Sequence, residues 1–308
     1  MLAAATVGDN PPTATTLHAK GPRMPNSTVA RPAVPHAAIE GPSRSNRLEN
    51  RIAAVFGAGS SAPGWGNGKA AAVAYARAGA RVVCIDRNLE TAAETAEIIK
   101  SENASASALA CDVGSDDDVV TTIATIQRDL GPIDILHNNV GIAVMGGPVE
   151  LDEADWKRVL DINLTGIFRT TKHVLPQMID AGRGVITNIS SIAAIRHTGY
   201  PYASYYASKA AINQFTVGLA IDHARQGIRA NVIMPGLIDT PLIYQQISGE
   251  YASVDDMVAA RNQACPSGIM GTAWDIANAA VFLASDEARY ISGVCLPVDG
   301  GLSTVANS

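Results

Sequence analysis

Short apolar runs rich in β-branched residues alternate with stretches of helical period along residues 51–308. This alternation is typical of βαβ units, in which crossover helices join parallel strands and cover both faces of the sheet. Because such crossovers are right-handed, we expect a doubly wound parallel sheet with its ligand site at the carboxyl ends of the strands. The expected strands are Ile52–Phe56, Arg81–Ile85, Ile133–His137, Val185–Ile189 and Ile228–Ile233. The expected helices are Gly68–Ala78, Thr91–Ser101, Asp116–Leu130, Asp155–Ala181 and Ala203–Gln226.

The first 45 residues differ from the rest of the chain, because they hold 7 of the 16 prolines and show no hydrophobic period. Such a segment buries too little apolar surface to offset the entropy of ordering it, so we predict a disordered N-terminal extension over residues 1–45. It could be an inert tail, a transit peptide, or the result of a start site upstream of Met24. Residues 46–308 are then expected to form a single α/β domain.

Charge and composition exclude several classes of protein. With 23 Lys and Arg against 29 Asp and Glu, the net charge is −6, which speaks against nucleic acid as a partner. No apolar run approaches the roughly 20 residues that span a bilayer, so we expect a cytoplasmic protein without a membrane partner. The four cysteines and six histidines show no metal-ligand spacing, and we therefore predict no metal.

A glycine-rich loop follows the first expected strand and leads directly into a helix. Glycines at such a turn let the backbone approach a pyrophosphate, whose charge then meets the helix N-terminus. The next strand ends at Asp86, where a carboxylate can bind the ribose hydroxyls of NAD and repel the 2′-phosphate of NADP. The sequence therefore favours NAD as the cofactor, with NADP as the less favoured alternative. The residues assigned to this part of the cofactor are Gly57, Gly59, Gly66, Asn67, Gly68, Asp86 and Arg87.

Tyr205 and Lys209 are spaced by four residues within an expected helix, so their side chains should share one face. Upstream, Ser190 and Ser191 end an expected strand and place hydroxyls at the carboxyl edge of the sheet. A tyrosine, a lysine and a serine at this edge would lie where the cofactor should end.

With these motifs in order, the chain resembles the single-domain short-chain dehydrogenase/reductase family over residues 48–308. The resemblance implies a Rossmann fold and a catalytic set of Asn163, Ser191, Tyr205 and Lys209. Ser191 stands fourteen residues before Tyr205, one more than is usual, which leaves Ser190 as an alternative to the favoured Ser191. The matching motifs are Gly66-Asn-Gly68, Asp86, Cys-Asp112-Val113, Asn138-Asn-Val-Gly141, Asn163, Ser191, Tyr205 with Lys209, Pro235-Gly236-Leu-Ile238-Asp-Thr240 and Val-Asp299-Gly300-Gly301.

The resemblance also implies further contacts with the cofactor. Asp112 and Val113 would hold the adenine, and Ile238 and Thr240 would contact the nicotinamide carboxamide. Eight residues separate Gly57 from Gly66, five more than the family's usual spacing, so either Gly57 or Gly59 would act as the first glycine. The other positions assigned to the cofactor are Asn139, Gly141, Pro235 and Gly236, with Tyr205 and Lys209 at its nicotinamide end.

The implied function is an NAD-dependent oxidoreductase that transfers a hydride between nicotinamide and a secondary alcohol or ketone. One alternative is a 3-oxoacyl-thioester reductase that uses NADPH, and another is a cofactor-sensing binding protein without turnover. Residues 237–271 are expected to form a lid over a moderately apolar small-molecule substrate. The resemblance further implies a homo-oligomer, either a tetramer or a dimer.

Overall fold

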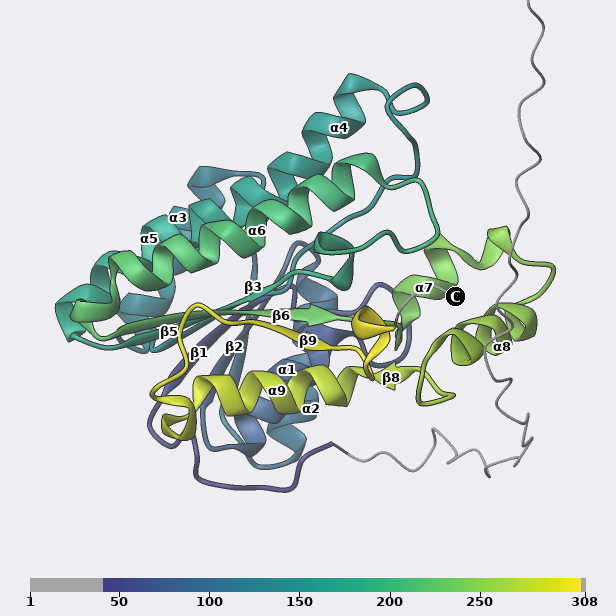
Figure 1. Ribbon diagram of the computed structural model, residues 1–308. Coiled ribbons are helices and arrows are strands. Elements are labelled where there is room, and N and C mark those ends of the chain that lie inside the picture. The colour runs from purple at the N-terminus through teal and green to yellow at the C-terminus, as the bar shows by residue number, and fades with distance from the viewer. Residues whose placement is uncertain (1–40, 306–308) are drawn as a thin grey trace, which may run out of the picture. The chain divides into compact units, whose positions relative to one another are not determined.

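The computed structural model describes residues 41–305. Seven parallel strands form one sheet in the order β3-β2-β1-β4-β5-β6-β9 (Figure 1). The chain therefore moves outward from β1 in two directions, and the predicted doubly wound α/β fold is confirmed. The strands are β1 (Ile52–Phe56), β2 (Arg81–Asp86), β3 (Ala106–Ala110), β4 (Ile135–Asn138), β5 (Gly184–Ile189), β6 (Ile228–Pro235) and β9 (Cys295–Val298).

Helices cover both faces of this sheet, as Figure 1 shows. On one face lie α1 (Asn67–Arg77), α2 (Leu89–Ser101) and α9 (Ala273–Ala284), and on the other lie α3 (Asp116–Asp129), α4 (Glu153–Leu160), α5 (Gly166–Ala181) and α6 (Ala203–Asp222). Alternate residues of β1 pack into two separate cores, because side chains of a strand point to opposite faces in turn. Ala53 and Val55 belong to one core, and Ala54 and Phe56 belong to the other.

Most helices begin at the residue types that cap helices. Ser115 accepts a hydrogen bond from the backbone N–H of Asp118 at the start of α3, and Asp152 accepts one from Asp155 at the start of α4. By contrast, α1 begins after Gly66 without any side-chain cap. Its first backbone N–H groups therefore remain available for another acceptor.

In the main sheet and its crossover helices, the structure differs from the expected elements at one helix and at two additional strands. The single helix expected over Asp155–Ala181 is interrupted by a turn of π-helix at Asp161–Thr165, which separates α4 from α5. Strands β3 and β9 were not expected, because their sequences lack the β-branched runs of the central strands.

Residues 237–271 lie beyond the carboxyl end of β6 and contain short elements. These are β7 (Ile238–Asp239), α7 (Pro241–Gln246), α8 (Val254–Ala264) and β8 (Gly271–Thr272), with β7 and β8 paired in a separate two-stranded sheet. In Figure 1, α7 and α8 stand beside the edge of the sheet where β6 ends. They are thus placed where a covering segment for the ligand site would be needed.

The disorder predicted for residues 1–45 falls on residues outside the described range, except for residues 41–45. Within those, the backbone N–H of Ser45 donates to Arg77 at 2.8 Å, and Leu48 just beyond is 1% exposed. The chain is therefore held against α1 from about residue 45 onward. Among the described residues, no helix is long and apolar enough to cross a membrane.

Candidate active site

The glycine loop closes tightly against its neighbours at the carboxyl ends of β1 and β4. Gly57 has a φ of +82°, and a Cβ at this position would lie 2.9 Å from the backbone N of Val140. A Cβ at Gly68 would collide with the carbonyl oxygen of Gly57. Only glycine therefore fits at both positions, which brings the start of α1 against the end of β1.

Asp86 ends β2 and points into the glycine loop. Its Oδ2 accepts a hydrogen bond from the backbone N–H of Gly59 at 3.1 Å, and its Oδ1 accepts one from Asn88 at 3.1 Å. A Cβ at Gly59 would lie 2.8 Å from the same carboxylate, so Gly59 is needed for this approach. Thus Gly57 serves the contact between the strands and α1, whereas Gly59 serves the contact with Asp86. The neighbouring Arg87 is exposed and forms no ion pair with any described residue.

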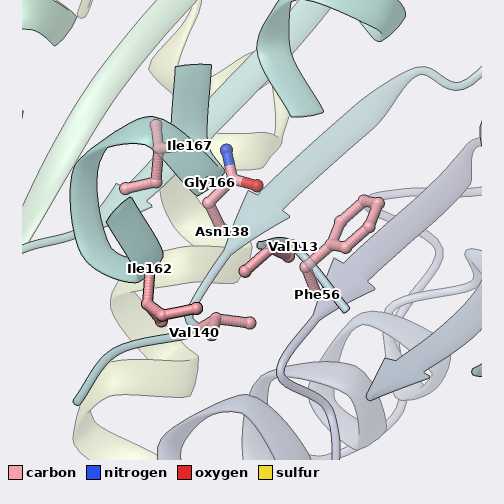
Figure 2. Close-up of a pocket in the computed structure, with 7 residues that line it drawn as sticks. All are labelled: Phe56, Val113, Asn138, Val140, Ile162, Gly166 and Ile167. Atoms are coloured by element: carbon pink, nitrogen blue, oxygen red, sulfur yellow. The ribbon is translucent and has the colours of Figure 1, made fainter. Parts of the chain in front are cut away.

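Asp112 and Val113 follow β3 on the far side of the loop. The Oδ1 of Asp112 accepts a hydrogen bond from Gly114 at 2.8 Å, whereas Val113 is buried. Figure 2 shows Val113 on the wall of a small cavity together with Phe56 and Asn138. This cavity measures about 10 Å³, no more than the room that one water needs, so it is a packing gap and not a ligand pocket.

Two asparagines at the end of β4 form hydrogen bonds at the carboxyl edge of the sheet. The buried Asn138 donates to Asn188 on β5 at 2.8 Å and accepts from Thr170 on α5 at 2.8 Å. Asn139 donates to the carbonyl of Gly57 at 3.1 Å. The end of β4 is therefore bonded to β5, to α5 and to the glycine loop.

The structure distinguishes the two serines that follow β5. Ser190 is 2% exposed, and its hydroxyl donates to the backbone carbonyl of Lys209 at 2.8 Å. Ser191 is partly exposed, and its hydroxyl forms a hydrogen bond with Tyr205 that lowers the pKa of the phenol. Ser191 is therefore the serine whose hydroxyl faces the tyrosine.

Tyr205 and Lys209 lie on one face of α6, as their spacing predicts. The Nζ of Lys209 stands 5.5 Å from the centre of the Tyr205 ring and donates to the carbonyl of Ile189 at 2.9 Å. Burial lowers the pKa of Lys209 to about 8. Burial also raises the pKa of Tyr205 above its ordinary value, and the hydrogen bond from Ser191 only partly offsets this rise. A nearby ammonium is expected to lower the pKa of a phenol, but Lys209 is not among the groups that lower the pKa of Tyr205.

Asn163 lies within the π-helical turn and is fully buried. Its Oδ1 accepts from the backbone N–H of Ile142 at 2.8 Å, and its Nδ2 donates to the carbonyl of the same residue at 2.9 Å. A Cβ at Gly141 would lie 3.2 Å from the Nζ of Lys209 and 3.7 Å from the Oδ1 of Asn163. These two side chains therefore approach each other across Gly141. π-helical turns often occur at functional sites, and this one holds Asn163 against the loop that carries Gly141.

The segment after β6 supplies the last group of assigned residues. A Cβ at Gly236 would lie 2.5 Å from the Cβ of Asp299, so glycine lets this turn pass close to the segment after β9. Pro235 and Ile238 are buried, and Thr240 is 9% exposed at the start of α7. The assigned residues of this segment thus lie at the carboxyl edge of the sheet, on the side of α7.

Two contacts of the extended glycine loop, residues 57–68, were not expected from the sequence. The side chain of Gln245 on α7 donates to the carbonyl of Ser61 at 2.9 Å. A Cβ at Gly64 would lie 3.0 Å from the ring of Pro241, the first residue of α7. The five additional residues of the loop therefore lie against the segment expected to cover the substrate.

Ser208 is a further residue that sequence reasoning missed. Its hydroxyl accepts from the Nδ2 of Asn163 at 3.1 Å and donates to the carbonyl of Tyr205 at 2.9 Å. Ser208 immediately precedes Lys209 on α6, and no sequence motif or residue spacing identifies it as part of the site.

The residues present fit a dinucleotide cofactor. Helix α1 begins directly behind the glycine loop without a side-chain cap, as at sites where a helix N-terminus binds a phosphate. The Oδ1 of Asn67, the first residue of α1, is buried and has no hydrogen-bond partner. A polar atom in that state is costly unless a ligand or water satisfies it.

Comparison with known proteins agrees with this geometry. The sequence model of a family described as enoyl-(acyl carrier protein) reductase matches residues 62–303. The 2-(S)-hydroxypropyl-CoM dehydrogenase 3 of Xanthobacter autotrophicus is 35% identical over 85% of this chain and 100% of its own length. A crystal structure described as a short-chain dehydrogenase/reductase from Burkholderia xenovorans matches with a TM-score of 0.80 and 40% identity, over 85% of this chain and 100% of that chain.

The chain belongs to the short-chain dehydrogenase/reductase family. Like its relatives in this family, it is an oxidoreductase that acts on CH–OH groups of a small molecule with a nicotinamide cofactor. Another member of known structure, the gluconate 5-dehydrogenase from Burkholderia cenocepacia, has a TM-score of 0.76 and 33% identity over 84% of this chain and 98% of its own. That structure contains NADP and tartrate. Family membership alone therefore does not select between NAD and NADP.

Proposed function

We propose that Tyr205, Ser191, Lys209 and Asn163 are the catalytic set of a secondary-alcohol dehydrogenase that prefers NAD. The observation that carries this proposal is the meeting of three groups at the carboxyl edge of the sheet. The Ser191 hydroxyl bonds to the Tyr205 phenol, and the Lys209 ammonium lies 5.5 Å from the same ring. An alcohol placed beside these groups would find a proton acceptor and a hydrogen-bond donor together.

In the oxidation direction, the substrate loses a hydride from its carbinol carbon and a proton from its hydroxyl, and becomes a ketone. A bound nicotinamide cofactor supplies the hydride acceptor, or the hydride donor in reduction. Tyr205 would take the hydroxyl proton and pass it on toward Lys209. Ser191 would donate to the substrate oxygen, where negative charge develops. The glycine loop, Asp86, Asn139 and the 235–240 segment would hold the cofactor.

The preference for NAD is supported by the position of Asp86. Its carboxylate already bonds to Gly59 in the phosphate loop, and it would accept from the ribose hydroxyls while repelling a 2′-phosphate. The NADPH-dependent 3-oxoacyl-thioester reductase is disfavoured on the same ground. The homo-oligomer and the cytoplasmic location remain predictions from the sequence.

The test of the catalytic set is Tyr205→Phe, which removes only the phenol oxygen. We expect turnover of a secondary alcohol or ketone to fall by at least about 100-fold, because the proton acceptor is lost. Binding of NAD, measured by calorimetry, should stay within a factor of two.

The matched control is Tyr206→Phe, the next residue on α6, whose hydroxyl bonds to Thr198 and Tyr200. This variant should keep most of its turnover. If Tyr205→Phe is as active as the parent, the proposed acid and base is wrong. A parent that binds NAD but turns over no alcohol or ketone in a broad panel would favour the binding protein without turnover.

A further inference from the structure

Arg261 on α8 is a buried cation without a carboxylate partner among the described residues. It is 8% exposed, and its one hydrogen bond runs from Nε to the Sδ of Met270 at 3.2 Å. No Asp or Glu within residues 41–305 lies within 4.0 Å of its guanidinium. Buried charges in proteins are normally paired, because removing an isolated charge from water is costly. The Nη atoms of Arg261 form no hydrogen bond with a described residue, so they are able to bind an anion.

Arg261 faces the interior and not the solvent side of α8. Met257, one helical turn earlier, is fully buried, so both residues belong to the inner face of the helix. The acidic residues of α8 lie in its first turn, at Asp255 and Asp256, and both are exposed. The guanidinium is thus directed away from the carboxylates of its own helix.

A group of tyrosines connects Arg261 to the catalytic candidates. The Tyr202 ring lies 5.8 Å from the Tyr205 ring and 5.7 Å from the Tyr200 ring, and the Tyr200 hydroxyl meets that of Tyr251 at 2.6 Å. The positive charge of Arg261 acts on Tyr200 and Tyr202 by lowering their pKa values, against a larger rise from burial. Arg261 thus acts on Tyr200 and Tyr202 through its charge, and it approaches them from the inner face of α8.

Two carboxylates that act on tyrosines of this region, Asp239 and Glu250, do not pair with Arg261. Asp239 accepts a hydrogen bond from Tyr244 at 2.8 Å. Glu250 is exposed, although its charge raises the pKa of Tyr202. Neither forms an ion pair with Arg261, so the fork of N–H donors on the guanidinium remains open to an oxyanion.

We propose that Arg261 binds the carboxylate of an anionic substrate whose secondary alcohol lies at Tyr205. This inference rests on the proposed function, because it takes Tyr205 as the reacting end of the site. The tyrosine rings between the two ends suit an aromatic or alicyclic body, which they can contact with their faces and edges. The substrate class is then a hydroxycarboxylic acid and its oxo acid, with the anion remote from the reacting carbon.

The first test measures binding without turnover. Benzoate and cyclohexanecarboxylate, together with their neutral amides, are titrated by calorimetry into the full-length protein in the presence of NAD. The parent should bind the carboxylates at least tenfold more tightly than the amides. Arg261→Gln should abolish this difference, and Arg261→Lys should keep part of it. Equal binding of acid and amide by the parent would overturn the proposal.

The second test measures turnover of 4-(1-hydroxyethyl)benzoate and of the corresponding benzamide. Arg261→Gln should lower kcat/KM for the carboxylate at least tenfold, chiefly through KM, and leave kcat/KM for the amide within twofold. An equal loss for both substrates would indicate a structural role and overturn the proposal.

Tyr205→Phe separates this inference from the function on which it rests. This variant should lose turnover of both substrates yet still bind benzoate more tightly than benzamide. If it keeps full turnover, the catalytic assignment fails, while the calorimetric comparison still decides the role of Arg261.

Discussion

At the scale of single residues, Lys209 is a buried ammonium whose direct hydrogen bond goes to a neutral carbonyl. Its pKa of about 8 lies well below its ordinary value of 10.5. Below pH 8 both the folded and the unfolded chain carry this proton, and burial of the charge then destabilises the folded state. Between pH 8 and 10.5 the unfolded chain binds more protons than the folded one, so this penalty decreases as the pH rises.

We therefore expect Lys209→Met to be more stable than the parent at pH 7, by up to about 3 kcal/mol for a shift of this size. The advantage should shrink between pH 8 and 10.5. Urea unfolding of both proteins at a series of pH values measures the difference in their free energies of unfolding. The contributions of the other titrating groups cancel in this difference. A stability difference that grows with rising pH would contradict the conclusion that Lys209 is a destabilising buried charge.

Asp86 is predicted to set the choice between the two nicotinamide cofactors. Asp86→Ser removes the carboxylate that would repel a 2′-phosphate, and it leaves the exposed Arg87 able to pair with that phosphate. The ratio of kcat/KM for NADP to that for NAD should rise by about 10- to 100-fold, which corresponds to one charge-assisted hydrogen bond.

The control for this change is Arg87→Gln, alone and combined with Asp86→Ser. If Arg87 pairs with the phosphate, the double variant should lose much of the gain. A parent that already prefers NADP would mean that the extended glycine loop has moved the adenosine away from Asp86.

The sequence predicted which side chains the fold brings together at the candidate site, but not the hydrogen bonds that each of them forms. Tyr205 and Lys209 could be found because a spacing of four on a helix is local information. The choice between Ser190 and Ser191 depends on which hydroxyl reaches Lys209 and which reaches Tyr205, and only the packing of β5 against α6 settles it. Arg261 could not be found, because its missing partner is a property of the folded environment and not of a motif.

At the scale of elements, Gly141 in the loop after β4 lies next to both α6 and the π-helical turn. A Cβ at this position would lie 3.2 Å from the Nζ of Lys209 and 3.7 Å from the Oδ1 of Asn163. Gly141→Ala should leave the fold intact, because the residue does not have a positive φ. The methyl group would displace the ammonium by a few tenths of an ångström, and we expect kcat to fall about tenfold.

Gly218→Ala on α6 is the matched control for Gly141→Ala, because a Cβ there has nothing within 4 Å. It should leave kcat unchanged and raise stability slightly, as alanine does in a helix. A normal kcat in Gly141→Ala would argue that the exact position of the Lys209 ammonium does not matter for turnover.

The alternation of apolar runs was sufficient to predict the central strands and the crossover helices. It failed where the sheet edge is built from small residues, as in β3, whose sequence Ala106–Ala110 contains no β-branched residue. It also missed the interruption at Asp161–Thr165, because a π-helical turn changes the hydrogen bonding without breaking the helical pattern of the sequence.

At the scale of the whole molecule, apolar side chains remain exposed on the helices of one face. Trp156 on α4, Phe168 on α5 and Ile221 on α6 are 37%, 50% and 71% exposed. Exposed apolar side chains on neighbouring helices favour this face as the one through which the subunits of the predicted homo-oligomer pair. Residues 45–48 pack on the α1 side of the sheet and would therefore not take part in this subunit interface.

We therefore expect a dimer or tetramer by size-exclusion chromatography with light scattering. Deletion of residues 1–40 should change neither the number of subunits nor the activity, because the contacts from Ser45 onward are kept. Phe168→Glu should lower the oligomeric mass, whereas Tyr290→Glu, a fully exposed residue elsewhere, should not. A monomeric parent would refute the interface, and a monomeric deletion variant would refute the inert tail.

Ser61 contacts Gln245, and Gly64 contacts Pro241. These contacts join the glycine loop, which would bind the cofactor, to α7, which belongs to the segment expected to cover the substrate. Two ligands that each order the same pair of segments must influence each other's affinity, and by the same factor in both directions. A substrate that closes α7 would then slow the departure of the cofactor, and a cofactor that fixes the loop would prepare α7 for the substrate. The five additional residues would in this way determine the order in which cofactor and substrate bind and leave.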